Sequence, residues 1–164
     1  MKSIFSAFCW GLLVLSCGPK TFDEQMQTLY SHSVPLIHAS QVQKQINSTN
    51  PIILDIRSQA EYEVSHIKGS QFIDYECFRA SDVAHLPKDS EIIVYCAVGY
   101  RSEKIGEKLI SLGFDHVSNL YGGIFDWKNQ DYVVVNHLNL PTDSVHTYNK
   151  DWAKWLYKGI KVYE

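Results

Sequence analysis

Residues 92–102, Ile92-Ile93-Val94-Tyr95-Cys96-Ala97-Val98-Gly99-Tyr100-Arg101-Ser102 (IIVYCAVGYRS), join an apolar run to a short loop that contains a cysteine. A continuous apolar run bounded by such a loop predicts a strand buried on both faces of a parallel sheet. Ser102 opens a helix-like segment to Leu112, with Ile105 and Leu109 on one face and Gly113 after its end. The stretch therefore predicts a strand, a turn with a thiol, and a helix.

The same alternation of strands and helices continues on both sides of this stretch. Further strands are expected at Leu36–His38, Ile52–Asp55, Phe72–Asp74 and Val117–Leu120. Helical segments are expected over Gln41–Ile46 after a cap at Ser40, after Ser58 with Glu61 completing a capping box, partly over Tyr75–Leu86, and over Ile124–Asn129. The pattern predicts an α/β fold, an open and mostly parallel sheet flanked by helices on both faces. The reactive crevice of such a sheet lies beyond the carboxyl ends of its strands, where Asp55 and Cys96 fall.

Composition limits the range of functions. The chain has 164 residues, of which 45% are hydrophobic and 20% charged, as expected of an ordinary folded domain. The formal net charge of −3 gives no basic footprint for nucleic acid, so no nucleic-acid partner is expected.

The N-terminus has the features of a secretory signal peptide over residues 1–16. Lys2 is followed by an apolar run from Ile4 to Leu15, which is short for a membrane span of about 20 residues. The following Val14-Leu15-Ser16-Cys17-Gly18 resembles a bacterial lipobox, with Val14 where leucine is usual. We expect a lipid on Cys17 and an exported protein of the cell envelope, anchored on the periplasmic or surface side of a bacterial membrane. The alternative is a plain signal peptide that is cut nearby.

The remaining chain divides into three parts. Residues 17–34 are polar and weakly periodic, and are expected to form the lipidated N-terminus followed by a tether or a loosely packed first segment. Residues 35–130 hold the α/β alternation. Residues 131–164 form a tail in which Trp152, Trp155 and Leu156 have helical spacing, so these side chains are expected to dock the tail on the domain rather than bind a ligand.

Cysteine usage directs attention to Cys96. Of the four cysteines, Cys9 and Cys17 belong to the signal region. The two that remain, Cys77 and Cys96, are too few for a disulfide framework. A thiolate is the reactive form of cysteine and needs positive potential around it. The backbone N–H groups of Ala97, Val98, Gly99, Tyr100 and Arg101, the start of the following helix and the Arg101 charge would supply it. We therefore predict Cys96 as the catalytic residue and residues 97–101 as the substrate-binding loop.

Three ordered motifs resemble the rhodaneses, the thiosulfate sulfurtransferases. The loop matches C-x-x-G-x-R-S at Cys96, Gly99, Arg101 and Ser102. The upstream segment LDIRSQAEYEVSHIKGSQFID, residues 54–74, matches D-x-R, E-[YF] and H-I-x-G, with Ser65 and Ser70 replacing the usual Gly and Ala. Residues 120–127 match L-x-G-G-[ILM]-x-x-W. The resemblance covers residues 35–130.

The resemblance implies a rhodanese-type sulfurtransferase that works through a persulfide on Cys96. It implies a small-molecule sulfur donor such as thiosulfate and a thiol or cyanide acceptor. We expect no cofactor, and no metal, because none of the seven histidines has metal-ligand spacing with cysteine. An oxidising compartment would make a standing thiol vulnerable, which favours a reductant protein as a further partner. The alternative is a non-catalytic sulfur carrier, redox module or partner-binding module at the membrane surface.

The polar residues around the motifs are expected to have structural roles. Arg57 and Glu61 are four apart near a helix start, which favours an ion pair between them. Asp55 is expected to orient the loop, and His66 to fill a structural hydrogen-bonding position. Arg101 either attracts an anionic donor or ties down the loop through carbonyls or a buried carboxylate.

Two further alternatives concern cysteine chemistry. Cys77 is either a resolving thiol that attacks a persulfide on Cys96 or a free thiol without a partner. A phosphatase or arsenate reductase would use C-x5-R, whereas Arg101 follows Cys96 at C-x4-R. The shorter loop makes a smaller cup, which suits a sulfur atom better than a phosphate.

Overall fold

A five-stranded parallel sheet forms the centre of the computed structural model, which describes residues 20–163. All four strand pairings in it are parallel, and the strand order is β1-β5-β4-β2-β3. The strands are β1 (Leu36–Ile37), β2 (Ile52–Asp55), β3 (Gln71–Phe72), β4 (Glu91–Tyr95) and β5 (His116–Leu120). The predicted α/β class is confirmed, and the strand that precedes Cys96 is the central one.

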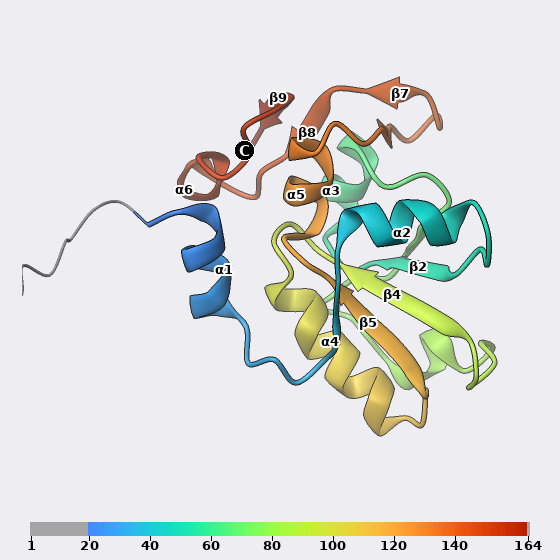
Figure 1. Cartoon of the computed structure of the whole chain (residues 1–164). Helices are drawn as coiled ribbons and strands as arrows, with labels where there is room; N and C mark the ends of the chain where they lie inside the picture. The colour runs from blue at the N-terminus through green and yellow to red at the C-terminus, as the bar shows by residue number, and fades with distance from the viewer. Residues whose placement is uncertain (1–19, 164) are drawn as a thin grey trace, which may run out of the picture.

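Helices cover both faces of this sheet. Figure 1 shows α2, α3 and α5 on one side and α4 on the other. The helices are α1 (Phe22–Leu29), α2 (Ala39–Ile46), α3 (Gln59–Val64), the 3-10 helix η1 (Ala80–Val83), α4 (Tyr100–Ser111), α5 (Gly123–Asn129) and α6 (Lys150–Ala153).

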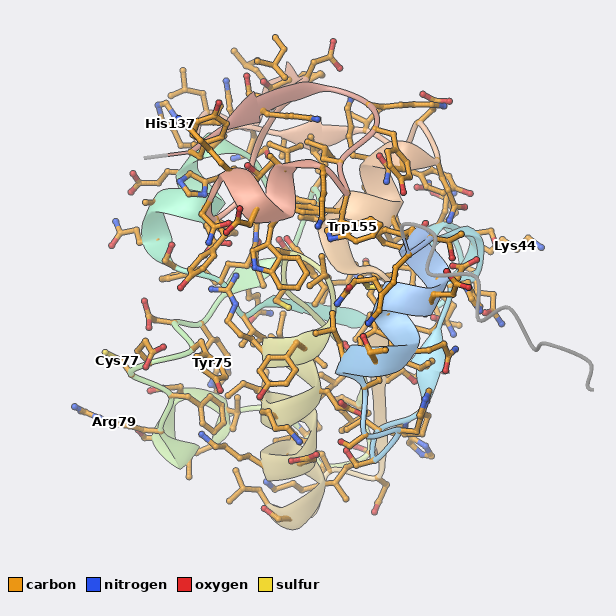
Figure 2. The ribbon with its side chains drawn as sticks, turned by 90° about the vertical axis from the view of Figure 1, so that its left-hand side faces the viewer. Lys44, Tyr75, Cys77, Arg79, His137 and Trp155 are labelled. Atoms are coloured by element: carbon orange, nitrogen blue, oxygen red, sulfur yellow. The ribbon has the colours of Figure 1, made fainter. Side chains whose placement is uncertain are left out.

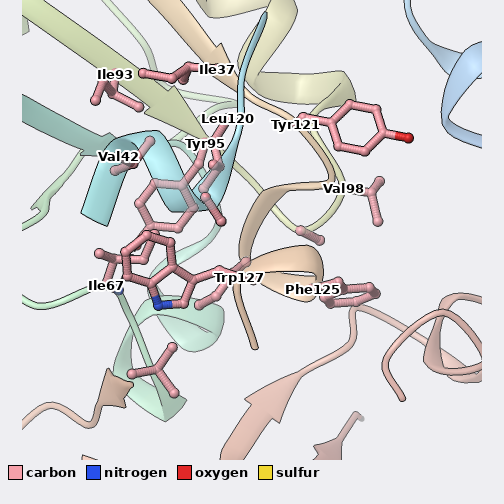
Figure 3. Packing of buried hydrophobic residues seen from close by; sticks show 14 of the residues in the cluster. Ile37, Val42, Ile67, Ile93, Tyr95, Val98, Leu120, Tyr121, Phe125 and Trp127 are labelled. Atoms are coloured by element: carbon pink, nitrogen blue, oxygen red, sulfur yellow. Dashed lines mark hydrogen bonds between the residues drawn. The ribbon is translucent and has the colours of Figure 1, made fainter. Parts of the chain in front are cut away.

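Alternate side chains of β4 supply two separate cores. Ile93 and Tyr95 point to the face of α2 and α5, where they join a cluster that includes Trp127 (Figure 3). Ile92 and Val94 point to the opposite face and pack with apolar side chains of α4. Because both faces of β4 are buried, the strand is apolar throughout its buried part.

Three helices begin earlier than predicted, α5 by the single residue Gly123. α2 begins at Ala39 rather than Gln41, because the N–H of His38 donates to the side chain of Gln41 at 3.1 Å and takes the capping position expected of Ser40. α4 begins at Tyr100, because Gly99 forms its N-cap. The capping box of Ser58 and Glu61 on α3 is confirmed.

The segment between α3 and β4 differs more strongly from the predicted secondary structure. β3 covers Gln71–Phe72 instead of Phe72–Asp74, since its partner β2 ends at Asp55, opposite Phe72. Of the helical content expected in residues 75–86, only η1 forms. Asp74 accepts the N–H groups of Glu76 and Cys77 at 2.8 and 3.2 Å, and such a turn competes with a helix.

In the residues that the structure describes, the N-terminal segment forms a helix and packs on the domain more closely than a tether would. Residues 22–29 form α1, capped by Thr21 and Glu24, and Met26, Tyr30 and Val34 are buried. This segment lies along α4, where Glu103 accepts the N–H groups of Ser31 and Ser33 at 2.9 and 3.1 Å. The predicted signal peptide and Cys17 lie outside the described residues. Within residues 20–163 no helix is both long and apolar enough to cross a membrane.

The C-terminal tail packs on the domain through more than one element. It contains β6 (Val134–Val135), β7 (Pro141–Thr142), β8 (Ser144–His146) and β9 (Ile160–Val162), in two small two-stranded sheets. The spacing of Trp152, Trp155 and Leu156 predicts a helix through all three residues, but α6 ends at Ala153, before Trp155. Trp155 and Leu156 are nevertheless buried in the core on the α5 side, and Figure 2 shows Trp155 between the tail and the rest of the molecule.

Candidate active site

Cys96 lies at the carboxyl end of the central strand, where the chain turns into α4. Its side chain is buried, and the N–H of Gly99 donates to Sγ at 3.1 Å. Of the loop amides predicted to surround the sulfur, this is the one with a hydrogen bond to it. The turn therefore holds the sulfur at the positive end of a twelve-residue helix.

The loop carbonyls are fixed by the start of α5. Ile124 N–H donates to the carbonyl of Cys96 at 2.9 Å, and Phe125 N–H donates to that of Ala97 at 3.1 Å. The third sequence motif thus belongs to the site, through its backbone. Asn119 contributes a further contact, donating to the Gly99 carbonyl at 2.9 Å.

Tyr30 holds the loop from the N-terminal segment. Its hydroxyl donates to the carbonyl of Val98 at 2.6 Å and accepts the N–H of Gly122 at 2.8 Å. Burial raises the pKa of Tyr30, so the hydroxyl keeps its proton for this contact. Gly99 has φ +97°, and a Cβ there would lie 2.4 Å from the Tyr30 oxygen. The sequence analysis missed Tyr30, although Met26 and Tyr30 are four residues apart, as on one helix face.

The expected ion pair between Arg57 and Glu61 is wrong. α3 begins at Gln59 after its cap, so Arg57 precedes the helix and the i,i+4 geometry does not apply. Arg57 instead donates to both oxygens of Asp55, at 2.9 and 2.7 Å, and to the carbonyl of Ser65.

Glu61 pairs with Arg101 across the loop. The two Nη atoms of Arg101 donate to the two carboxylate oxygens at 2.9 and 2.7 Å. Burial acts to raise the pKa of Glu61, but the hydrogen bonds and charge of Arg101 outweigh it and lower this pKa to about 2. Of the two roles left open for Arg101, the contacts support tying down the loop through a buried carboxylate.

Asp55 and His66 lie in the structural framework of the site. Tyr95 Oη donates to Asp55 at 2.5 Å, beneath the loop, and the Asp55 side chain is fully buried. His66 Nδ1 is 3.1 Å from the carbonyl of Tyr62, and the two rings stack at 3.9 Å. Both residues support the scaffold in these contacts.

A cavity of about 340 Å³ opens at Cys96. Four predicted loop residues line it, while Gly99 contributes its N–H to the sulfur instead. The other walls come from outside the loop, and the sequence analysis did not assign them. The lining residues are Leu29, Glu76, Cys96, Ala97, Val98, Tyr100, Arg101, Tyr148 and Trp152. Trp152, expected only to dock the tail, therefore also faces the site.

Cys77 lies apart from this cavity. Its side chain is exposed at the surface (Figure 2). Both described cysteines are free thiols. It borders a neighbouring surface hollow, whereas the preceding Glu76 lines the Cys96 cavity. Within residues 20–163 no group of three or more histidine, cysteine or acidic side chains is arranged to hold a metal ion.

A parallel α/β sheet with a cysteine loop at the end of its central strand defines the class of protein. The rhodanese-like domain family model matches residues 38–130. The chain belongs to this family, and the predicted rhodanese-like domain is confirmed.

Solved structures agree with this assignment. The rhodanese-like domain of the Alr3790 protein from Anabaena sp. is 30% identical, with a TM-score of 0.55, covering 62% of this chain and 79% of that one. The BH2092 protein of Bacillus halodurans, at 24% identity and a TM-score of 0.59, covers 71% of this chain and 85% of that one, and shares the fold.

Curated relatives of this chain are named as tRNA uridine(34) hydroxylases. A tRNA uridine(34) hydroxylase of Listeria monocytogenes is 29% identical over 126 residues, covering 67% of this chain and 40% of the relative. Another, of Bacillus velezensis, is 31% identical over 118 residues, covering 62% of this chain and 37% of the relative. The chain thus spans less than half the length of these relatives.

Proposed function

We propose that the protein is a sulfurtransferase that moves a sulfane sulfur from a donor to a thiophilic acceptor through a persulfide on Cys96. The observation that carries this is the position of the sulfur. A buried thiol receives an N–H from Gly99 at 3.1 Å and still faces a cavity that opens to solvent. This arrangement gives the sulfur a hydrogen-bond donor and leaves it accessible to a small substrate.

The transfer has two displacement steps. The Cys96 thiolate attacks the outer sulfur of the donor, the bond from that sulfur to the donor breaks, and its electron pair leaves with the donor fragment. A thiolate or cyanide then attacks the outer sulfur of the persulfide, and the pair of that S–S bond returns to Cys96. Neither step needs a strong general base, in keeping with the structural contacts of Asp55 and His66.

Phosphatase chemistry is disfavoured at this loop. Arg101, which follows Cys96 at C-x4-R, already has its guanidinium paired with Glu61. We expect no turnover of an aryl phosphate by the purified protein, and measurable hydrolysis would contradict the assignment.

The test of the proposal is multiple turnover. The protein is mixed with excess sulfane-sulfur donor and cyanide, and thiocyanate is measured against enzyme concentration. We expect many equivalents per protein and none from Cys96→Ser. One equivalent, and no more, would favour the alternative of a carrier whose partner supplies turnover.

A role in tRNA modification is a second candidate. It is favoured by the name of the relatives, tRNA uridine(34) hydroxylase, and it stands against the expectation of no nucleic-acid partner. The net charge of −3 and the partial coverage of those relatives weigh against it. Incubation with tRNA that carries uridine at position 34, followed by nucleoside mass spectrometry, tests it. A hydroxylated uridine would replace our first proposal.

We also propose export and a lipid anchor on Cys17, from the signal-like N-terminus. Fractionation of cells expressing the full chain and Cys17→Ala tests this. We expect the wild type in the membrane fraction and the variant outside it, with the same sulfur transfer in both. Membrane association of the variant would refute lipid anchoring at this residue.

We propose a reductant protein as a further partner, and it would be sought by trapping a mixed disulfide between that protein and Cys96.

A further inference from the structure

Among residues 20–163, no unpaired positive side chain lines the cavity at Cys96. Among its lining residues Arg101 is the only cation, and both of its Nη atoms bond Glu61. The ring of Tyr148 also lies over this guanidinium, at 5.5 Å. Glu76 adds a carboxylate to the lining. A small inorganic dianion such as thiosulfate would therefore find no free side-chain cation in this lining, and would depend on the loop amides and the start of α4 alone.

The remaining walls are apolar or aromatic. They come from α1, the loop, the start of α4 and the C-terminal tail, and consist of Leu29, Ala97, Val98, Tyr100, Tyr148 and Trp152. The volume of about 340 Å³ falls within the range of about 300–1,000 Å³ typical of sites for small organic ligands. Such walls stabilise a carbon skeleton beside the sulfur.

The tail holds Tyr148 in an unusual conformation. Its φ is +64°, in the left-handed region that non-glycine residues rarely adopt. Its N–H donates to Nδ1 of His146, a buried side chain, at 3.1 Å. Its side chain remains largely exposed, yet it lines the cavity. Strained positions persist where the surroundings fix them, and here the result is an aromatic side chain placed over the site.

We infer that the donor is an organic sulfane-sulfur compound, with an apolar or aromatic group and no more than one negative charge, and that Tyr148 and Trp152 are the residues that select it. The inference rests on the proposed function, since it names the donor class for the same cysteine. An organic thiosulfonate illustrates the step. Cys96 takes its outer sulfur, the S–S bond breaks, and the electron pair leaves with the sulfinate, so charge and atoms balance without an oxidant.

Three donors of graded size and charge test the inference. Thiosulfate, methanethiosulfonate and benzenethiosulfonate are each mixed with the full chain, and the rate of persulfide formation at Cys96 is measured by quenched mass spectrometry. Each rate is divided by the rate of the same donor with a free thiol, which removes differences in intrinsic reactivity. We expect the aromatic donor to exceed the methyl donor by about tenfold, the scale on which pockets discriminate apolar groups, and thiosulfate to be slowest.

Variants of the tail assign the selectivity. Tyr148→Ala, at an exposed position, and Trp152→Ala are each expected to bring the aromatic-to-methyl ratio toward unity by slowing the aromatic donor more than the methyl donor. Trp152→Phe should retain most of the preference, which guards against misreading a loss of folding. Tyr163→Ala is the matched control, an exposed tyrosine of the same tail that does not line the cavity.

The outcomes separate the two claims. Equal normalised rates for all three donors, or a ratio unchanged in both tail variants, would overturn the inference and leave the sulfurtransferase proposal standing. Absence of a persulfide from every donor would overturn the sulfurtransferase proposal itself.

Discussion

The two ends of the described chain meet at the Cys96 site, yet they contact different parts of it. The N-terminal segment reaches the backbone of the loop and of the α5 N-terminus, because the Tyr30 hydroxyl bonds Val98 and Gly122. The C-terminal tail reaches the cavity and its side chains, through Tyr148 over Arg101 and through Trp152. The N-terminal contacts therefore fix the shape of the loop, which affects the reaction of every donor alike. The contacts of the tail form the wall of the cavity, which distinguishes one donor from another.

The largest loss of unfolding free energy is expected at Gly99, where Tyr30 of the N-terminal segment leaves no space for a side chain. Gly99→Ala places a Cβ 2.4 Å from the Tyr30 hydroxyl at φ +97°. We expect a loss of about 3 kcal/mol in unfolding free energy, combining left-handed strain with overpacking. Urea unfolding measures it. Gly113→Ala is the control, because φ is +84° there but nothing lies within 4 Å. It should lose only about 1 kcal/mol, and equal losses would remove Tyr30 from the explanation.

The ion pair between Glu61 and Arg101 should give a pH-dependent effect. The pKa of Glu61 is lowered from 4.5 to about 2 on folding, so its stabilisation is present above pH 4.5 and is lost as pH falls through about 2. We expect Glu61→Gln to cost about 2 kcal/mol at neutral pH, and this difference from wild type to shrink below pH 4.5. Denaturation at a series of pH values tests it.

Glu107→Gln serves as the control for that series. Glu107 pairs with Lys104 at the surface, where solvent weakens the interaction, so its effect should be much smaller. A constant cost of Glu61→Gln from pH 7 to pH 2 would show that charge is not the source of the stabilisation.

The smallest loss of unfolding free energy is expected from removing the hydroxyl oxygen of Tyr30 in the N-terminal segment. Tyr30→Phe loses one hydrogen bond to Val98 of the loop and one to Gly122 at the start of α5, and should lower the unfolding free energy by about 1–2 kcal/mol. Sulfur uptake should slow by the same factor for every donor. Tyr121→Phe, whose hydroxyl donates to Asp23 instead of the loop, is the control. A change in donor preference caused by Tyr30→Phe would erase the distinction between the two ends.

The sequence predicted what local patterns determine. β2 and the capping box of α3 were located correctly, since an apolar run and a Ser-x-x-Glu spacing are visible in neighbouring residues. The misassigned pair of Arg57 and Glu61 arose from a local boundary, because the helix starts two residues after Arg57.

The terminal segments could not be predicted in the same way. Tyr30 contacts residues 68 and 92 positions further along the chain. Trp152 was expected only to dock the tail, because helical spacing indicates a buried face but not which cavity that face borders. The loop residues were recognisable from their motif, whereas the wall that gives the cavity its chemistry depends on the tertiary arrangement.

The central claim is that Cys96 carries the transferred sulfur, and intact-protein mass spectrometry tests it most directly. The full chain, Cys77→Ser and Cys96→Ser are each treated with benzenethiosulfonate and then with cyanide. We predict a gain of one sulfur atom in the first two, released by cyanide as thiocyanate, and no gain in Cys96→Ser. A gain that survives in Cys96→Ser, or no gain in any of the three, would contradict the account.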